Sequence, residues 1–512
     1  MLIAPNQLVL LGPPGTGKTT TLLNMVQEEL NRGIKPEEIA FVSFTKKAVQ
    51  EAADRACAQF NLKRKRLPLF QTVHSLCFRE LGCSKQNLMG RQNFTELGDW
   101  LGYDMSGQYD MADGVLPTGA APGDKFLFLD NIARVKCVSI RATWEDEGFD
   151  VAWAEQERFS AGYEMYKKKN GLMDFTDLLH RYVEEGRPVR VKVVVIDEAQ
   201  DLSKAQWMVL QKAFSGAQKV IIAGDDDQSI YKWSGADLET FLALEGDREI
   251  LSHSYRLPRV VYEKANSVIM QVRKRFTKKF TPRDAEGDIN YVSMLEQIDI
   301  NPDEETLILV RNVYLLNNIY ELLHTRGYTY TGRNGFTSVK PAHVQAIVAW
   351  EHLRKAPGNA LTIANAKEMY EHLRVGGLVA RGGKAALNSI EDPDLALTLD
   401  DLRVRFGLTR DPLPVWHDAL EGISLETRQY YITVLREKRR ISSTPKIHVN
   451  TIHGVKGGQA DHVVIMSDMS KRTYVEMDKD RDSEHRVAFV ALTRAKERIT
   501  IVLPQGKYHY PY

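Results

Sequence analysis

GPPGTGKT, residues 12–19, is the stretch that decides the fold, and it follows directly on the apolar run LVLL at residues 8–11. A glycine-rich turn lets successive backbone N–H groups point at one anion, and the helix that begins near Lys18 adds the positive end of its dipole. The Lys18 ammonium can reach the outer phosphates, and the Thr19 hydroxyl can bind Mg²⁺. Strand, loop and helix follow in the required order, so the sequence predicts a nucleoside-triphosphate site at the end of a buried strand.

The composition is that of an ordinary soluble protein. The chain has 512 residues, 43% hydrophobic and 26% charged, which is too long for one core and suggests roughly three to four domains or subdomains. No apolar stretch approaches the ~20 residues that span a bilayer, and the N-terminus leads into a predicted core strand instead of a secretory signal. The four cysteines lack CxxC spacing, so we expect buried free thiols in a reducing cytoplasm.

The net charge of +1 does not by itself indicate a polyanionic partner. Basic residues are concentrated at KRKR (63–66), KKK (167–169) and RKRFTKK (273–279). These clusters could follow the phosphates of a nucleic acid, although a solvated helix face would explain each of them separately.

Strand and helix patterns alternate along the chain in α/β fashion. The predicted elements of the first part are a strand at 8–11, a helix ending at 32, a strand at 39–44, a helix at 46–60, and β-branched strands at 191–196 and 219–223. Continuous β-branched runs are typical of strands buried on both faces of a parallel sheet.

A second α/β unit begins near residue 251. Its predicted elements are a strand at 306–310, a helix at 315–325, a strand at 463–467, a helix at 486–496 and a strand at 499–503. Residues 84–166, with a Gly/Pro-rich stretch at 114–123, and residues 335–443 are predicted to be mostly helical. The chain therefore reads as two α/β cores, each interrupted by a helical insertion.

A pair of carboxylates follows the predicted strand VVVI at 193–196, which runs into DEAQD at 197–201. Adjacent carboxylates at the end of a buried strand are costly unless they have a function. Beside a phosphate loop, Asp197 can hold Mg²⁺ through water, and Glu198 can accept the proton of the water that attacks the terminal phosphate. A helix N-terminus with acidic first-turn residues is the alternative interpretation.

Motifs in a fixed order make the chain resemble the UvrD/Rep-type superfamily 1 (SF1A) DNA helicases, in a compact version. They are GPPGTGKT at 12–19, DEAQD at 197–201, GDDDQSIYKW at 224–233, SYRLP at 254–258, NTIHGVKG at 450–457 and FVALTRAK at 489–496. The resemblance implies an α/β protein of two RecA-like P-loop domains with parallel sheets, each carrying a mostly helical insertion. The implied boundaries are 1–83 and 169–250 for domain 1A, 84–168 for insertion 1B, 251–334 and 444–512 for domain 2A, and 335–443 for a short insertion 2B.

The resemblance also implies the parts of an ATP site. Glu198 would be the base, Gln228 would orient the attacking water, and Arg256 and Arg494 would reach across a cleft as arginine fingers, where surface salt bridges are the alternative. Tyr255 would stack on the base, and Thr19 and Asp197 would hold Mg²⁺. The residues expected to bind the nucleotide in the loop are Gly12, Pro13, Pro14, Gly15, Thr16, Gly17, Lys18, Thr19 and Thr20.

A nucleic-acid strand would contact aromatic residues and short polar loops, because stacking tolerates any base. The residues implied are Phe44, Thr45, Thr72, His74, Tyr231, Trp233, Arg311 and His453. Core filling is the alternative for Tyr231 and Trp233, a surface pair with Asn312 for Arg311, and a buried core histidine for His453. Residues 471–481 fall where relatives carry a strand-separating hairpin, with Tyr474 as a candidate wedge.

Several positions depart from the family pattern. Gln7 lies too close to Lys18 to act as the upstream adenine-reading glutamine, Thr20 replaces a usual arginine, and Gln459 replaces a usual glutamate. ATP is the favoured nucleotide, and other triphosphates stay open.

We expect an ATP-driven helicase that moves 3′→5′ on single-stranded DNA and meets single-strand/duplex junctions, since three motifs resemble the 3′→5′ branch. The expected partners are DNA and a loading, repair or replication protein, without a membrane, for a monomer or weakly self-associating protein. The expected location is the cytoplasm of a bacterial or phage-infected cell, associated with the nucleoid. A translocase that strips proteins from strands and a nucleotide-switched binding module are the alternatives, and RNA stays open as the track.

Overall fold

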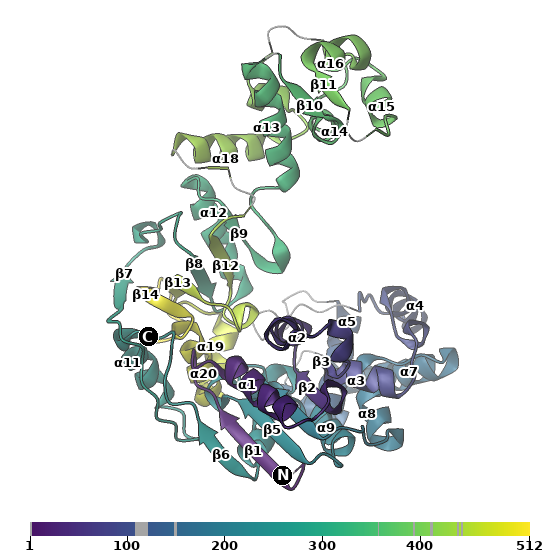
Figure 1. Cartoon of the computed structure of the whole chain (residues 1–512), viewed down its shortest axis with the longest axis vertical. Coiled ribbons are helices and arrows are strands. Elements are labelled where there is room, and N and C mark those ends of the chain that lie inside the picture. The colour runs from purple at the N-terminus through teal and green to yellow at the C-terminus, as the bar shows by residue number, and fades with distance from the viewer. Residues whose placement is uncertain are drawn as a thin grey trace.

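The computed structural model describes residues 3–107, 121–147, 151–356, 358–392, 395–409, 413–437, 440–441 and 444–512. Residues 114–120 of the Gly/Pro-rich stretch lie outside these ranges. The described part forms a broad body with an arm that extends away from it (Figure 1). Within it, no helix combines the length and apolar character needed to cross a membrane.

The first α/β domain is built on an all-parallel sheet with the order β3-β2-β4-β5-β1-β6. Its strands are β1 (Asn6–Leu11), β2 (Ile39–Ser43), β3 (Phe70–Thr72), β4 (Val193–Asp197), β5 (Lys219–Gly224) and β6 (Asp247–Ile250). Its helices are α1 (Lys18–Asn31), α2 (Lys46–Phe60), α3 (Val73–Glu80), α8 (Phe175–Glu185), α9 (Lys204–Ala213) and α10 (Leu238–Leu242).

Successive side chains of β4 point to opposite faces of the sheet, and both faces are covered by helices. This explains why the sequence of β4 is apolar throughout. Val194 and Ile196 belong to the cluster covered by α3, α8 and α9, whereas Val193 and Val195 belong to the cluster covered by α1 and α2. Every residue of the strand is buried, so both faces of the sheet exclude water, as expected for a parallel sheet between helical layers.

A helical insertion follows α3. It contains α4 (Arg91–Leu101), α5 (Pro122–Lys136), α6 (Ile140–Glu147) and α7 (Trp153–Asn170). Of these helices, α4, α5 and α7 share a hydrophobic cluster of their own whose buried members run from Met89 to Tyr166. The insertion therefore has a small core separate from the sheet.

The second α/β domain has an all-parallel sheet with the order β7-β14-β13-β8-β12-β9. Its strands are β7 (Asp288–Val292), β8 (Thr306–Val310), β9 (Tyr330–Thr331), β12 (Ile447–Thr451), β13 (Ala460–Met466) and β14 (Ala495–Val502). Its helices are α11 (Arg259–Ile269), α12 (Leu316–Thr325), α19 (Lys471–Lys479) and α20 (Arg481–Leu492). The expectation of two parallel α/β domains is thus confirmed.

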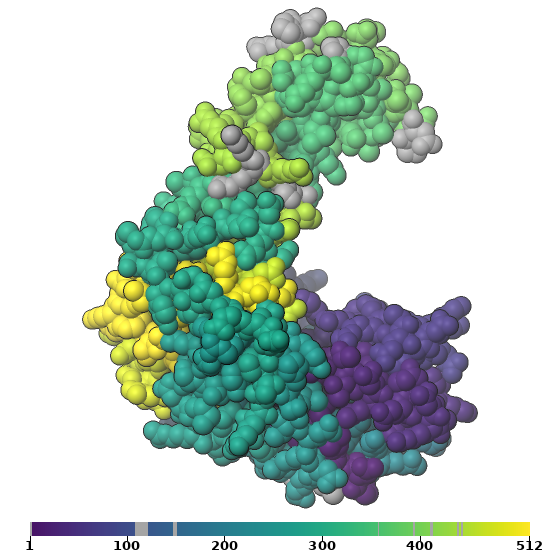
Figure 2. All heavy atoms as spheres, turned by 60° about the vertical axis from the view of Figure 1, so that its left-hand side comes forward, coloured from purple at the N-terminus to yellow at the C-terminus, as the bar shows by residue number. Residues whose placement is uncertain are grey.

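The arm leaves the second domain after β9 and returns before β12. It contains α13 (Pro341–Lys355), β10 (Ala360–Thr362), α14 (Ile363–Glu371), α15 (Gly383–Asn388), β11 (Ala396–Thr398), α16 (Leu399–Phe406), α17 (Trp416–Ala419) and α18 (Leu425–Arg436). Its buried residues from Val339 to Val434 form one cluster. Figure 2 shows an open space between this green arm and the purple N-terminal part.

Two local expectations in the second domain are wrong. The helix predicted at 486–496 is α20, which ends at Leu492, and β14 begins at Ala495 because that residue pairs with Ala460 of β13. Residues Lys471–Lys479 form α19 instead of part of a hairpin. The side chain of Ser470, the residue before α19, accepts a hydrogen bond from the Thr473 N–H and caps the helix.

Candidate nucleotide site and strand groove

The loop after β1 is held against the next strand of the sheet. The Gly12 N–H donates to the Gly224 carbonyl at 3.0 Å, and Gly15 and Gly17 adopt left-handed backbone angles, with φ of +75° and +76°, that favour glycine. Gly17 is the residue before α1, and no described side chain caps that helix end. A helix N-terminus of this kind, next to Lys18, suits a bound phosphate.

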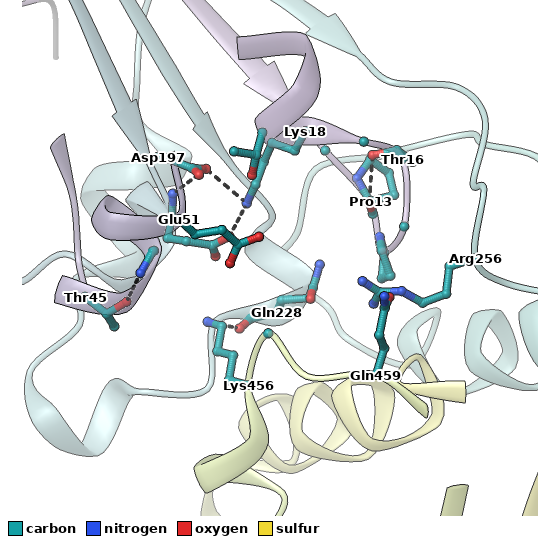
Figure 3. A pocket seen from close by; sticks show the side chains of 18 of the residues that line it. Pro13, Thr16, Lys18, Thr45, Glu51, Asp197, Gln228, Arg256, Lys456 and Gln459 are labelled. Carbon is teal, nitrogen blue, oxygen red and sulfur yellow. Dashed lines mark hydrogen bonds and ion pairs between the residues drawn. The ribbon is translucent and has the colours of Figure 1, made fainter. Parts of the chain in front are cut away.

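Lys18 lies against Asp197, the last residue of β4 (Figure 3), and against Glu198, which follows it in the chain. Its Nζ is 2.6 Å from Glu198 Oε1 and 3.5 Å from Asp197 Oδ1. Burial alone would lower the pKa of Lys18, but the two carboxylates raise it above its usual value. Burial raises the pKa of Glu198, and the stronger attraction of Lys18 and Lys456 lowers it to about 2. Glu198 is therefore ionised at neutral pH, as a base must be.

The backbone of Glu198 is left-handed, with φ of +54°. A non-glycine residue in this region costs on the order of 1–3 kcal/mol, and such strain is common at functional sites. The Glu198 side chain also accepts a hydrogen bond from Gln200 Nε2 at 2.6 Å. The protein thus holds this carboxylate in a defined position that its own backbone does not favour.

The donors needed for Mg²⁺ are present in the same cavity. The Thr19 hydroxyl and the Asp197 carboxylate both line it, and oxygen ligands are those that Mg²⁺ prefers. Burial and the charge of Glu198 raise the pKa of Asp197. A divalent cation would remove this cost by stabilising the ionised carboxylate, so the residues fit the metal.

Gln228 links the two domains at the centre of the site. It follows β5, which pairs with β4 in the parallel sheet. Its Nε2 donates to Asp225 Oδ2 at 2.8 Å, and its Oε1 accepts from Arg494 Nη2 at 2.8 Å. Arg494 comes from the turn between α20 and β14 of the second domain. A side chain that lines the same cavity as the carboxylate pair is thus in direct contact with the second domain.

Arg494 is buried and Arg256 is half-buried, and neither has a carboxylate partner among the described residues. Arg256 Nη1 donates to the Thr493 carbonyl at 3.2 Å, while its Nε has no partner in the described part of the chain. Arg494 Nε donates to the Val490 carbonyl at 2.9 Å. Burial lowers the pKa of Arg256 to about 10 and that of Arg494 to about 9. These guanidinium groups are not surface salt bridges, and a bound anion would offset their desolvation.

A cavity of about 350 Å³ joins these groups. Its lining includes the whole of residues 12–20, Asp197, Glu198, Gln228, Arg256 and Arg494. The lining leaves out Tyr255, which is 72% exposed and whose N–H donates to the Gly15 carbonyl of the loop at 2.8 Å. An exposed ring above the loop could stack on a base. Gln7 is buried elsewhere and donates to the Glu245 carbonyl.

Sequence reasoning assigned no role to an ion pair that crosses the cleft. Lys456 Nζ lies 2.5 Å from Asp201 Oδ2 and 2.7 Å from the Gln228 carbonyl oxygen. Both charged residues lie within motifs that can be recognised in the sequence. Nothing in the sequence, however, indicates that these two residues pair with each other. On α2, Arg55 donates to the Thr20 hydroxyl at 2.6 Å, and it also lines the cavity.

A second cavity, of about 770 Å³, lies between the first domain and its insertion. Its lining includes Phe44, His74, Phe175, Ser234 and Asn334. Burial lowers the pKa of His74 to about 4, so this side chain is neutral. An open groove with aromatic walls is suited to unpaired bases.

Aromatic rings connect the groove with the nucleotide cavity. Phe44 lines both and stacks on Tyr231 at 5.8 Å between ring centres. The Tyr231 hydroxyl donates to the His453 carbonyl at 3.0 Å, and Trp233 meets the His453 ring edge to face. Burial lowers the pKa of His453 well below its usual value. Tyr231 is half-buried in this cluster, so core packing and strand contact are both compatible with its position.

The remaining residues predicted to contact a nucleic-acid strand lie outside this aromatic cluster. Thr45 and Thr72 accept hydrogen bonds from Ala48 and Ser75 and cap α2 and α3. Thr45 lines the nucleotide cavity. Arg311 is buried in an ion pair with Glu484 at 2.7 Å, so it is not a surface pair with Asn312, and the described linings of both cavities leave it out.

Basic clusters noted in the sequence are partly neutralised inside the protein. Lys167 contacts Asp177 at 2.6 Å, and Arg66 pairs with Glu37. In the 273–279 stretch, Arg275 and Lys278 bind the buried acidic residues that precede Gln228. Lys167, Arg275 and Lys278 are therefore committed to largely buried pairs, whereas the Arg66–Glu37 pair lies at the surface.

A phosphate loop, a carboxylate pair at the end of a parallel strand and arginines from a second parallel sheet define a two-domain P-loop NTPase whose site lies between the domains. The family model for the UvrD/REP helicase N-terminal domain matches residues 3–249, and that for the UvrD-like helicase C-terminal domain matches residues 428–506. The chain belongs to the UvrD/Rep helicase family.

Curated relatives are similar over part of their length. The "ATP-dependent DNA helicase PcrA" of Staphylococcus aureus is 25% identical over 312 residues, covering 57% of this chain and 42% of the relative. The protein of the same name from Bacillus subtilis is 26% identical over 299 residues, covering 55% of this chain and 40% of the relative. The matched region thus spans less than half of these relatives. A solved structure of PRRSV helicase aligns with a TM-score of 0.34 and 10% identity over 98% of this chain and 53% of the other, a similarity too low to define the fold.

Proposed function

We propose that the chain is an ATP-dependent motor that moves 3′→5′ on single-stranded DNA and unwinds duplexes at single-strand junctions. The observation that carries the proposal is the cleft itself, where Gln228 of the first domain contacts Arg494 of the second at 2.8 Å. Relatives named ATP-dependent DNA helicases support ATP and DNA as the ligands.

Hydrolysis would use the residues of the cleft in separate roles. The loop N–H groups and Lys18 would bind the triphosphate, and Thr19 and Asp197 would hold Mg²⁺, which would supply positive charge to the phosphate oxygens. Glu198 accepts the proton of the attacking water, which Gln228 orients. Arg256 and Arg494 stabilise the charge of the transition state from the other domain. Hydrolysis then requires the two domains to be closed, and this couples chemistry to motion.

The strand would lie in the groove of the first domain and reach Phe44 and the Tyr231 cluster. Stacking contributes roughly 1–3 kcal/mol per base without sequence preference. Because Phe44 also lines the nucleotide cavity, a strand that shifts this ring can alter the site of hydrolysis. A loading, repair or replication protein, a monomeric or weakly associating state, and a nucleoid-associated location in a bacterial or phage-infected cell remain part of the proposal.

A translocase that displaces proteins without efficient unwinding is the second candidate. The observation that favours it is α19, which occupies the place where a strand-separating hairpin was expected. Comparing the unwinding of a tailed duplex with the displacement of streptavidin from a biotinylated strand distinguishes the two activities.

The decisive experiment measures ATP hydrolysis with and without single-stranded DNA, for the wild type and for Lys18→Ala. We expect strong stimulation by DNA that the substitution abolishes, because Lys18 would hold the outer phosphates. Single-stranded RNA and GTP serve as alternative ligands in the same assay. Hydrolysis that is indifferent to any nucleic acid would contradict the motor and favour a nucleotide-switched binding module.

A further inference from the structure

A buried cluster of charges lies directly behind Gln228. Asp225, Asp226 and Asp227 surround Lys278, whose Nζ is 2.6 Å from Asp225 Oδ1 and 2.9 Å from Asp227 Oδ2 and also contacts Asp226. The Lys278 side chain is only 1% exposed. Arg275 completes the cluster by pairing with Asp227 at 2.6 Å. A lysine enclosed by three carboxylates keeps its charge, and the carboxylates raise its pKa despite burial.

Asp225 is the member of this cluster that contacts the catalytic groups. Its Oδ2 accepts from Gln228 Nε2 at 2.8 Å, and its backbone N–H donates to Gln200 Oε1 at 3.0 Å. Gln200 in turn donates to Glu198 at 2.6 Å. Gln228, proposed to orient the water, is therefore bonded directly to Asp225, and Glu198, proposed as the base, is connected to Asp225 through Gln200. Lys278 donates to the other carboxylate oxygen of Asp225.

Hydrogen-bond polarity along this chain of contacts leaves one orientation for the Gln228 amide. Lysine and arginine can only donate, and an ionised carboxylate can only accept. Lys278 donates to Asp225, Asp225 accepts from the Gln228 Nε2–H, and Gln228 Oε1 accepts from Arg494. A flipped amide would bring its NH₂ group toward Arg494 and its oxygen toward a carboxylate, so it would lose both bonds.

The segment that carries Lys278 is fixed to the first domain although it follows α11 of the second. The Phe276 N–H donates to Asp226 Oδ2 at 2.9 Å, and the Phe276 ring packs edge to face on Phe241. Arg486 of α20 donates to the Asp226 carbonyl at 2.9 Å. Lys278 is thus held from several sides and can position a neighbour.

We propose that Lys278 is a positioning residue for hydrolysis, which acts through Asp225 to fix the amide of Gln228 between the two domains. The inference rests on the role proposed above for Gln228. It predicts that Lys278 affects the rate of the chemical step more than the affinity for ATP, because its contacts lead to the water-orienting group and not to the phosphate loop.

The first test compares Lys278→Met with Arg275→Met in strand-stimulated ATP hydrolysis. Each substitution removes one positive charge from the same cluster, but only Lys278 contacts Asp225. We expect Lys278→Met to lower kcat by roughly 30-fold or more, a typical effect of misplaced catalytic groups, with KM for ATP changed by less than about threefold. Arg275→Met should keep kcat within about threefold of the wild type. Equal effects of the two substitutions would overturn the inference.

A second test repeats Lys278→Met in a Gln228→Ala background. If Lys278 acts through Gln228, the lysine substitution should cause almost no further loss of kcat once the glutamine is absent. A general structural role predicts the same further loss as in the wild-type background, and that result would overturn the inference.

A third pair of variants covers the case in which Lys278→Met does not fold. Asp225→Asn and Asp226→Asn are isosteric, and both residues contact Lys278. In Asp225→Asn, Lys278 keeps the amide oxygen on its side, so the new NH₂ group faces Gln228 Nε2 and disrupts the bond. We expect a loss in kcat of about tenfold or more for Asp225→Asn and little for Asp226→Asn. Equal rates would overturn the inference, whereas a wild type without nucleic-acid-stimulated hydrolysis would overturn the proposed function itself.

Discussion

Carboxylates in the cleft have ion-pair partners, whereas two of its arginines have none in the described part of the chain. Glu198 and Asp201 have cations within 2.6 Å, in Lys18 and Lys456, whereas Arg494 is buried and Arg256 is half-buried, and neither has a described carboxylate partner. Unpaired buried cations are costly, and the electrostatic arrangement is complete only when an anion with several negative oxygens enters. At the residue scale, the site is therefore organised for a polyphosphate.

The role of Glu198 can be tested by Glu198→Gln. The substitution keeps the size of the side chain but removes its basicity, so we expect ATP hydrolysis to fall by roughly 10²–10⁴-fold while binding of single-stranded DNA is retained. Steady-state hydrolysis and fluorescence anisotropy with a labelled oligonucleotide measure the two properties.

Glu51→Gln is the matched control, because Glu51 lines the same cavity from α2 without contacting Lys18. Its turnover should stay near that of the wild type. Unchanged turnover in Glu198→Gln would remove Glu198 as the base.

At the scale of elements, α19 shows how local sequence overrides an expectation taken from relatives. Ser470 caps the helix, and the Asn312 side chain accepts from the Ser470 N–H at 2.8 Å and donates to Thr473 at 3.0 Å. Tyr474 packs against Tyr508, with 5.4 Å between the ring centres, and against the core of the second domain. The Tyr474 ring is thus packed against the second domain and is not an exposed wedge.

Tyr474→Ala should therefore destabilise the protein without a specific loss of unwinding. Removal of a partly buried ring predicts a decrease of about 2 kcal/mol in the free energy of unfolding, measured by chemical denaturation. Arg472→Ala, on the exposed face of the same helix, should cost at most about 0.5 kcal/mol. A loss of unwinding with unchanged stability in Tyr474→Ala would restore the wedge interpretation.

At the scale of the whole molecule, the two α/β domains meet through the Lys456–Asp201 ion pair and the Arg494–Gln228 hydrogen bond. Burial raises the pKa of Asp201 to about 6, although Lys456 partly offsets this effect. The pKa of an aspartate in the unfolded chain is about 3.9. Asp201 therefore binds a proton more readily in the folded protein than in the unfolded chain. Asp201 therefore stabilises the fold fully below pH ~4, and this contribution is lost as the pH rises through ~6.

We predict that strand-stimulated hydrolysis declines as the pH falls below about 6. Protonated Asp201 no longer attracts Lys456 across the cleft, whereas Glu198, with a pKa of about 2, stays ionised. Rates measured between pH 5 and 8 should show this acidic limb in the wild type and lack it in Asp201→Asn. Asp177→Asn, which alters an ion pair with Lys167 outside the cleft, should retain the limb. An acidic limb that persists in Asp201→Asn would assign it to another group.

Much of the architecture could be predicted because it is encoded locally. The buried runs of β4 and β5 and the glycine-rich loop after β1 predict parallel strands that carry the motif residues at their carboxyl ends, and the structure confirms the parallel strands. The boundaries of the domains and the roles of the individual site residues stay predictions. The end of α20 was missed because the apolar run that spans its last turns gives no clear signal for the change from helix to strand.

The sequence by itself determined the two parallel α/β domains, the phosphate loop and the set of carboxylates, amide and arginines that the motifs contain. Only the tertiary structure decided which charges meet: Lys278 with Asp225, Lys456 with Asp201 and Arg311 with Glu484. The physical reason is that strand and loop formation depend on neighbouring residues. Each of these ion pairs instead joins positions far apart in the chain and exists only because packed domains bring them together in a desolvated space.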